Sequence, residues 1–237
     1  MIVIKREIRK YAKKKRAKSN AWFFKTSKGE YGEGDKFLGL TMGEQRLVAR
    51  KYGDLSLARV RKLLERGYHE ERMIGLLILV HKYEFAKNSE NNTGKKKIFN
   101  FYIRNRKAIN NWDLVDVTTP NIIGDFLLGG ADRKILYRFA KSKNIWERRM
   151  AVLATFKFIK QGDFKDALAI SKILLSDRHD LIHKAVGWML REVGKKDKKT
   201  LIKFLGKYST VMPRTALRYS LEKFSKKERK KYMTPTP

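Results

Sequence analysis

The sequence lacks cysteine entirely and has only four prolines among its 237 residues. The absence of cysteine excludes disulfide bonds, cysteine-ligated zinc sites and iron–sulfur clusters. Proline is the strongest helix breaker, and two of the four lie in the terminal Thr-Pro-Thr-Pro segment. Because Leu, Lys, Ala and Arg are abundant, the composition favours helix along nearly the whole chain.

Long apolar runs are also missing. The longest extends from Met73 to Val80, far short of the roughly 20 residues that span a bilayer. The N-terminal segment MIVIKREIRKYAKKKRAKS is basic but has no apolar stretch of signal-peptide length. We therefore expect a soluble, intracellular protein of the cytoplasm, associated with the nucleoid, with no membrane partner.

Acidic residues are scarce relative to basic ones. The chain has 56 Lys and Arg against 24 Asp and Glu, a net charge of +32. Self-repulsion on this scale destabilises a folded chain, so a polyanionic partner is expected. Nucleic acid is the first candidate and an anionic membrane surface the second.

Familiar catalytic and DNA-binding motifs are absent from the sequence. There is no GxSxG, no P-loop, no dinucleotide fingerprint, and no recognisable helix-turn-helix, zinc-finger or basic-zipper pattern. The HEER segment at residues 69–72 lacks the second histidine of a metalloprotease helix. These absences leave helical-repeat and other less specific architectures open.

The chain is expected to form one all-α helical-repeat domain over residues 1–237. Within it we expect a basic N-terminal helix or arm (1–20), a Gly-rich loop (24–39), helix-pair repeats (41–233), a polar loop (87–97) and a turn (129–132).

A repeated pattern supports this organisation. Second helices are expected to open at His69, Trp112, Trp146, Asp180 and Met212. Their spacing, about 32 to 43 residues, is typical of an α-solenoid of antiparallel helix pairs. Stacked pairs would place the same face of every second helix on one concave, basic, DNA-binding surface. An irregular helical bundle with coincidental spacing is the alternative.

The segment NNWDLVD is the most informative for chemistry. On a helix, Trp112 and Asp116 are four residues apart and share one face, whereas Asp113 points elsewhere. Asn111 or Asp113 could instead cap the helix start. A carboxylate on a DNA-facing surface is repelled by phosphates. Asp116 is therefore expected either to point away from the DNA or to have a functional role.

Two further segments carry basic and aromatic residues. In WERRM, Arg148 and Arg149 point about 100° apart on a helix, so only one of them can face the groove. Trp146, at the start of that helix, is expected in the core.

The segment DLIHKAVGWMLRE is expected to be a helix with His183, Gly187 and Arg191 on one face and Trp188 beside Arg191. Because glycine weakens a helix, Gly187 indicates close approach of another group to the backbone. His179 and His183 have the spacing of a metal pair but no third ligand nearby, so no metal site is expected.

Together these segments resemble the AlkD-like family of DNA alkylation-repair glycosylases. The resemblance begins with WFFKTSKGEYGEGDKFLG, continues through NNWDLVD, WERRMAVLATFKFI and HDLIHKAVGWMLREVGKKD, and ends with MPRTALRYSLEKF. These segments occur in the family's order and cover most of the chain. The basic N-terminal arm is assigned no role by the resemblance.

The resemblance implies HEAT-like repeats and hydrolysis of the N-glycosidic bond of N3- and N7-alkylated purines, without a metal or cofactor. It implies that Asp116 is catalytic and that Trp112, Trp188 and Arg149 contact the lesion, with Arg148 the alternative to Arg149. We further expect DNA contacts from Arg148, His183, Lys184, Arg191 and Arg214.

The expected partner is duplex DNA that contains alkylated bases, bound by a monomer with no obligate protein partner. Whether the damaged base leaves the helix is open. A non-catalytic repeat module for DNA junctions or flaps is the runner-up. An RNA- or ribosome-binding repeat protein would equally suit the charge.

Overall fold

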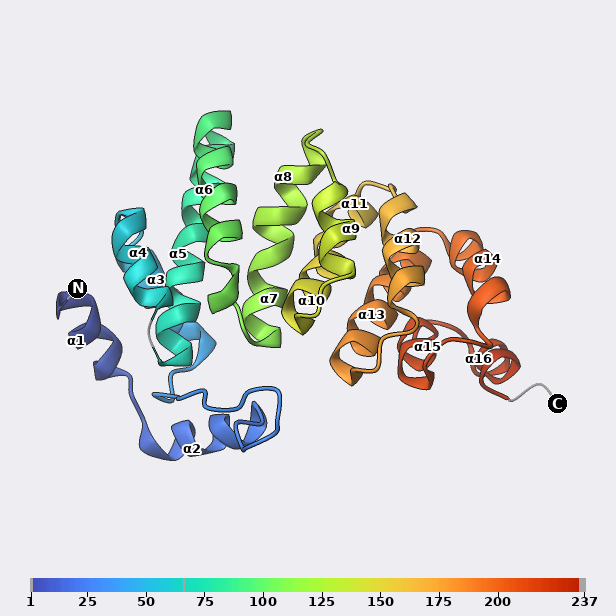
Figure 1. The fold of residues 1–237 in the computed structure, drawn as a ribbon, viewed down its shortest axis with the longest axis horizontal. Coiled ribbons are helices and arrows are strands. Elements are labelled where there is room, and N and C mark those ends of the chain that lie inside the picture. Colours follow the sequence, from blue (N-terminus) through green and yellow to red (C-terminus); the bar gives the residue numbers. More distant parts are fainter. Residues whose placement is uncertain (1, 66, 235–237) are drawn as a thin grey trace. The chain divides into compact units, whose positions relative to one another are not determined.

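The computed structural model describes residues 2–65 and 67–234, and Figure 1 shows their fold. Within these ranges the chain is helical, and its β-pairing consists of one isolated bridge between Lys36 and Tyr68. The expected all-α fold class is thereby confirmed. None of the described helices has the length and apolar character needed to cross a membrane.

The chain divides into two compact units, Met1–Thr118 and Thr119–Pro237. The helices that begin in the first unit are α1 (Ile2–Lys10), α2 (Lys14–Phe23), α3 (Met42–Lys51), α4 (Leu57–Leu64), α5 (His69–Asn88), α6 (Asn92–Arg104), the short 3₁₀ turn η1 (Arg106–Ala108) and α7 (Trp112–Thr119).

The core of the first unit is built around α5. Its apolar stretch from Met73 to Val80 is buried on all sides, as expected for a helix enclosed by neighbours. Helices α3, α4 and α6 pack against it. The basic helix α2 and the loop that follows it, both blue in Figure 1, lie next to the N-terminal ends of α5 and α7.

The helices of the second unit follow a π-helical turn, η2 (Pro120–Gly124). They are α8 (Asp125–Leu128), α9 (Lys134–Ala140), α10 (Ile145–Ala154), α11 (Phe156–Lys160), α12 (Lys165–Leu174), α13 (Asp180–Lys196), α14 (Lys198–Tyr208), α15 (Arg214–Ser220) and α16 (Lys226–Met233).

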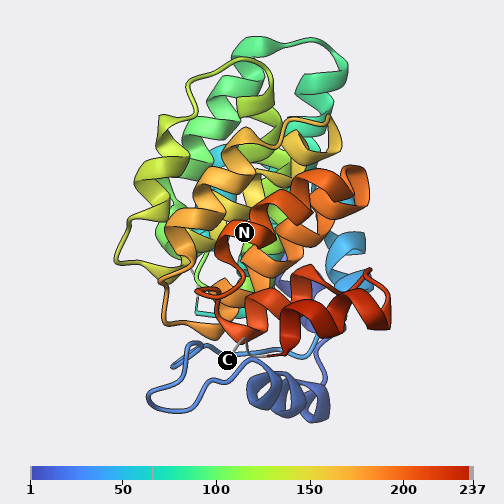
Figure 2. The same ribbon diagram turned by 90° about the vertical axis from the view of Figure 1, so that its right-hand side faces the viewer.

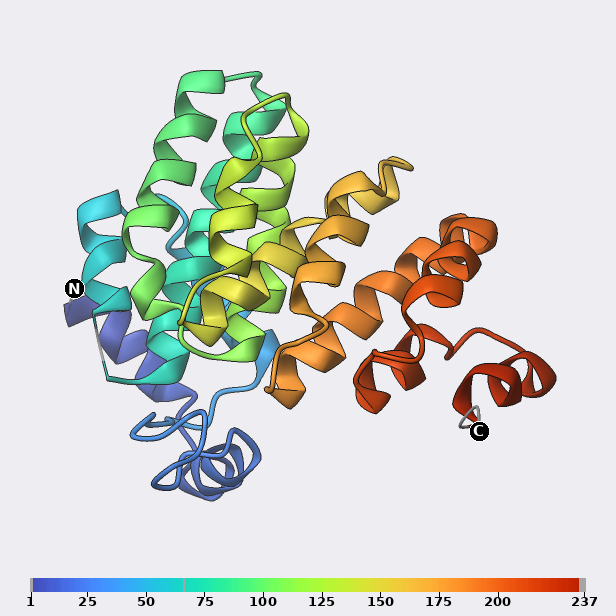
Figure 3. The same ribbon diagram turned by 45° about the vertical axis from the view of Figure 1, so that its right-hand side comes forward.

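Helix pairs stack in the second unit. The first helices of successive pairs, α9 and α12, pack against each other, and the second helices form a layer in which α13 contacts both α10 and α15. Figure 3 shows the helices of this unit, coloured from yellow-green through orange to red, side by side, and Figure 2 views the same stack from its C-terminal end. This is the arrangement of helix-pair repeats.

The expected second-helix openings agree with the structure. Helices α5, α7 and α13 begin at His69, Trp112 and Asp180, while α10 and α15 begin within two residues of the expected positions. Trp146 is buried, as expected.

The expected polar loop at residues 87–97 was wrong in extent. Helix α5 continues to Asn88 and α6 already begins at Asn92, because the Asn91 side chain caps α6 by accepting from the Gly94 N–H at 2.7 Å. The lysines that suggested a loop lie in the first turns of α6.

Gly187 permits a close contact in the layer of second helices. A methyl group at this position would lie 2.5 Å from Tyr219 Cβ and 2.6 Å from the Ala216 carbonyl oxygen. The group that approaches the Gly187 backbone is therefore helix α15.

Gly187→Ala is expected to lower the free energy of unfolding by about 1–3 kcal/mol, since the added methyl group meets backbone that cannot move aside easily. Gly206→Ala is the control: it is also a helical glycine, but a methyl group there meets nothing within 4 Å, so we expect a gain of up to about 1 kcal/mol. Urea denaturation measures both changes. Equal effects of the two substitutions would contradict the proposed packing constraint.

Candidate active site

Helix α7 carries the Trp112 and Asp116 pair. Leu114 and Val115 are fully buried, whereas Trp112 and Asp116 are half-buried. Because residues four apart share a helix face, the tryptophan and the carboxylate lie together on the less buried side. One face of α7 therefore packs into the core, and the other, with Trp112 and Asp116, is partly accessible to solvent.

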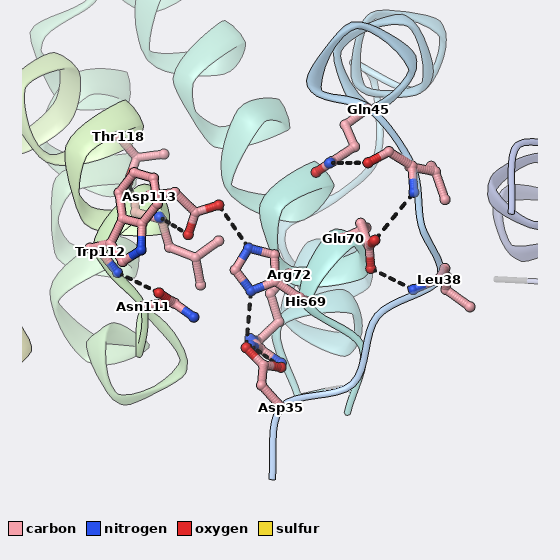
Figure 4. Close-up of polar contacts among 12 residues, drawn as sticks. Asp35, Leu38, Gln45, His69, Glu70, Arg72, Asn111, Trp112, Asp113 and Thr118 are labelled. Carbon is pink, nitrogen blue, oxygen red and sulfur yellow. Dashed lines mark hydrogen bonds and ion pairs between the residues drawn. The ribbon is translucent and has the colours of Figure 1, made fainter. Parts of the chain in front are cut away.

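Side-chain hydrogen bonds fasten α7 near both ends. Near its start, the Asp113 carboxylate accepts a hydrogen bond of 2.8 Å from His69 Nε2 on α5. Near its end, Thr118 Oγ1 lies 2.7 Å from the Tyr102 hydroxyl on α6. These contacts fix the helix against two neighbours, and Figure 4 shows the contact at its start.

The side chains of Asn111 and Asp113 also satisfy N–H groups of the first turn of α7. Asn111 Oδ1 accepts from the Trp112 N–H and Asp113 Oδ1 accepts from the Leu114 N–H, both at 2.8 Å. Free N–H groups at a helix start need such acceptors. Asp113 therefore both caps the helix and pairs with His69.

His69 joins two carboxylates in the interior of the first unit. Its Nε2–H donates to Asp113 and its Nδ1–H donates to Asp35 at 3.0 Å. The side chain is only 2% exposed, and burial alone would lower its pKa. The hydrogen bonds and charges of Asp113 and Asp35 outweigh this effect and raise the pKa of His69 to about 9. The ring is therefore an imidazolium at neutral pH.

Arg72 completes the charge balance of this cluster. Its Nη2 lies 2.8 Å from each oxygen of Asp35. Burial raises the pKa of Asp35, but the hydrogen bonds from His69 and Arg72 more than compensate and hold it below its usual value. Two carboxylates thus face two cations, which is the condition under which buried charges are tolerated.

Aromatic rings cover the same cluster. Phe24 stacks on Trp112 with ring centroids 5.4 Å apart, and Phe37 stacks on His69 at 4.7 Å. Phe24 also lies 4.9 Å from His69. A protonated imidazole is attracted to the faces of such rings. Both phenylalanines belong to the loop after α2, so this loop supports Trp112 from one side.

Glu70 holds the end of the loop in place. Its buried carboxylate accepts hydrogen bonds from three consecutive backbone N–H groups, those of Leu38, Gly39 and Leu40, at 2.8–3.2 Å. Figure 4 shows Glu70 between α5 and the loop. Charge-assisted bonds of this kind are stronger than neutral ones, so the loop that was expected from its glycines is a fixed element.

A π-helical turn follows the candidate catalytic residue. It covers Pro120–Gly124 and continues α7 directly into α8. Proline cannot donate the backbone hydrogen bond that an α-helix requires, and a wider turn accommodates this loss. Turns of this kind are frequent at functional sites.

The arginines expected near DNA have partners inside the second unit. Arg148 forms an ion pair with Asp177 at 2.5 Å and also donates to the carbonyls of Ser142 and Lys143. Arg149 is buried and donates to the Leu181 carbonyl at the start of α13. Their contacts to DNA or to a lesion stay predictions.

The face of α13 that carries His183, Gly187 and Arg191 is in contact with neighbouring segments. Gly187 meets α15, Arg191 pairs with Glu222, and His183 Nε2 lies 2.5 Å from the Asp177 carbonyl. DNA contacts from this face also stay predictions.

The other predicted contact residues of the second unit are placed as follows: Trp188 is half-buried with Phe156 at 6.1 Å, Lys184 pairs with Asp180 at 2.7 Å, and Arg214 donates to the Met233 carbonyl at 2.8 Å.

Sequence reasoning missed the residues that support Trp112. His69 was considered only for a zinc motif, and Asp35, Phe24 and Phe37 were treated as part of a structural loop. The unusual density of aromatic side chains in WFFKTSKGEYGEGDKF was a signal, since a solvent-exposed Gly-rich loop has little use for them.

Comparisons with known proteins agree on one family. A family model described as DNA alkylation repair enzyme matches residues 4–224. The fold is similar to that of a solved structure described as a predicted DNA alkylation repair enzyme from Enterococcus faecalis. The TM-score is 0.69 at 15% identity, over 91% of this chain and 97% of that chain. Among curated proteins, none matches this chain.

We expect a specific loss of stability at alkaline pH. Because the pKa of His69 is about 9 in the folded protein and 6.5 without its partners, its contribution is complete below pH 6.5 and disappears as pH rises to 9. A shift of this size corresponds to a contribution on the order of 3 kcal/mol.

Urea denaturation of the wild type and of His69→Gln between pH 6 and 9.5 measures this loss. Titration of lysines and tyrosines is common to both proteins and cancels in the difference. The wild-type advantage should shrink across this range, and two parallel curves would refute the role given to the imidazolium.

Proposed function

Since this chain belongs to the DNA alkylation repair enzyme family, we propose that it is a DNA glycosylase. It hydrolyses the N-glycosidic bond of N3- and N7-alkylated purines in duplex DNA, the first step of base excision repair. The observation that carries this proposal is the pairing of Trp112 and Asp116 on the half-exposed side of a helix that is fastened near both ends.

The chemistry requires few groups. An N3- or N7-alkylated purine already carries a positive charge, so the leaving base needs no added proton and no general acid. As the bond breaks, positive charge develops on the sugar, as in glycoside hydrolysis. A single fixed carboxylate can stabilise that charge and orient the attacking water.

Asp116 is assigned this role because it lies on the half-buried face of α7 that it shares with Trp112, four residues before it. The rigid anchoring of α7 matters because electrostatic stabilisation depends on groups that need not reorganise during the reaction. Trp112 lies on the same face and offers its π-face to the cationic base or sugar, a contact worth about 0.5–2 kcal/mol.

Trp188 and Arg149 of the second unit are proposed as further lesion contacts, on the strength of the resemblance. Arg148, His183, Lys184, Arg191 and Arg214 are proposed to contact the DNA backbone. The ion pairs of Arg148 and Arg191 with Asp177 and Glu222 position these side chains before DNA arrives. A phosphate would then share or replace the carboxylate partner.

Asp116→Asn is expected to slow release of 7-methylguanine from duplex DNA by about 10²-fold, the lower end of the range for proton-transfer roles. The cationic leaving group already lowers the intrinsic barrier, so a larger effect is not expected. DNA affinity should hold or rise, because removing a negative charge relieves repulsion from phosphates. Single-turnover release assays measure the rate.

The matched control is Asp54→Asn, which removes an exposed carboxylate from the first unit away from α7. It should leave the rate unchanged. Equal rates for Asp116→Asn and the wild type would remove Asp116 from the mechanism. A wild type that binds methylated duplex but releases no base would favour the non-catalytic DNA-binding module.

Binding to unmodified duplex DNA is expected to depend strongly on salt, because the protein carries a net charge of +32. The logarithm of the affinity should fall linearly with the logarithm of the salt concentration, with a slope of about −0.9 per phosphate neutralised. Fluorescence anisotropy between low and physiological salt measures the slope. An affinity that stays constant would count against phosphate-dominated binding.

A further inference from the structure

Helix α2 presents an unusual surface. Its last two residues, Trp22 and Phe23, are 83% and 57% exposed, and none of its residues is buried. Two adjacent exposed aromatic rings form a contiguous apolar patch, and such patches mark candidate binding surfaces. Trp22 and Phe23 line an open depression together with Lys18, Ser19 and Asn20.

Lysines gather on the same side of this helix as Trp22. At about 100° per residue, Lys14, Lys15, Lys18 and Trp22 fall within roughly 100° of arc, and all four are exposed. The opposite side, with Arg16, Ala17 and Phe24 among others, is partly covered. The outward face therefore combines positive charge with one large π-surface.

Helix α2 is held in a defined place on the first unit. Arg16 Nη1 donates to the Gly39 carbonyl at 2.9 Å and to Glu44 at 2.8 Å, and the Lys13 N–H donates to the Leu38 carbonyl. Gly39 has a φ of +86°, and a side chain there would lie 2.3 Å from the Lys13 carbonyl oxygen. The outward face of α2, which carries Lys14, Lys15, Lys18 and Trp22, is therefore held in a fixed position on the first unit.

The aromatic surface of α2 continues to the candidate active site. The ring of Phe23 packs edge-on against Trp112, with centroids 6.0 Å apart, and against Phe24 at 5.1 Å. Since Trp22 directly precedes Phe23, the exposed indole belongs to the same end of α2 as the ring that meets Trp112.

We propose that the Lys14–Trp22 face of α2 binds DNA beside the lesion, with the indole of Trp22 stacked on a base that has left the duplex. Phosphates explain the lysines and can accept a hydrogen bond from the indole N–H, but they offer no surface for the large π-face of the ring. In intact duplex, base faces are covered by their neighbours, so only an unstacked base presents one. This inference rests on the proposed function, because it takes DNA as the ligand.

The test compares two DNA hairpins, one fully paired and one with a single extrahelical 2-aminopurine. Stacking on an aromatic side chain is worth enough that Trp22→Ala should weaken binding to the extrahelical hairpin by roughly 5- to 150-fold. Binding to the paired hairpin should change little. The wild type should also quench 2-aminopurine fluorescence, and the Trp22→Ala variant should not.

Two control variants separate the parts of this surface. Phe85→Ala removes another exposed aromatic ring of the first unit, 76% exposed on α5, and should affect neither hairpin. Lys18→Ala should weaken binding to both hairpins equally. Equal affinity of Trp22→Ala and wild type for the extrahelical hairpin overturns the proposal.

Two further outcomes have separate meanings. If Trp22→Ala instead abolishes binding to phosphatidylserine-containing vesicles and leaves DNA binding intact, the surface serves membranes and the proposal is wrong. Release of 7-methylguanine is measured on the same proteins. Base release without a Trp22 effect defeats this inference alone, whereas a Trp22 effect without base release defeats the glycosylase proposal alone.

Discussion

The arrangement of the first unit depends on one buried imidazolium. His69 uses both ring nitrogens to hold two carboxylates, Asp113 at the start of α7 and Asp35 in the loop after α2. Removing either carboxylate would leave an uncompensated positive charge in the interior. Removing the ring would take the cation from Asp113, while Asp35 would keep its ion pair with Arg72. Because breaking a buried ion pair is strongly destabilising, the loop, α5 and α7 are coupled energetically and not merely adjacent.

This coupling determines what Trp112 and Asp116 can do. A short helix such as α7 gains little stability from its own hydrogen bonds. Its position is fixed by contacts with α5 and α6 and by the stacked ring of Phe24. The proposed catalytic carboxylate therefore lies on a support whose geometry is set by residues of α5, α6 and the loop after α2.

The local features of the molecule could be predicted from the sequence. The face shared by Trp112 and Asp116, the openings of α5 and α13, and the close approach at Gly187 all follow from helical periodicity and from the properties of single residues. The His69 cluster could not be predicted in this way, since its partners are 34 and 44 residues away. Such pairings depend on how distant segments pack, and no spacing rule encodes them. The loop predicted at residues 87–97 was wrong for a different reason. Solvent-facing helical turns and loops have similar compositions, so the lysines before Ile98 did not distinguish a helix from a loop.

The internal ion pairs of four arginines bear on the proposed function. Arg16, Arg72, Arg148 and Arg191 are each paired with a carboxylate within the fold, whereas α2 offers exposed lysines to solvent. An arginine fork fixes a phosphate in one geometry, but a lysine ammonium acts as a mobile point charge. Contacts of the second kind can pass from one phosphate to the next with little change in energy. Under the proposed function, the lysines of α2 would let this part of the protein shift along undamaged DNA in one dimension before it stops at a lesion.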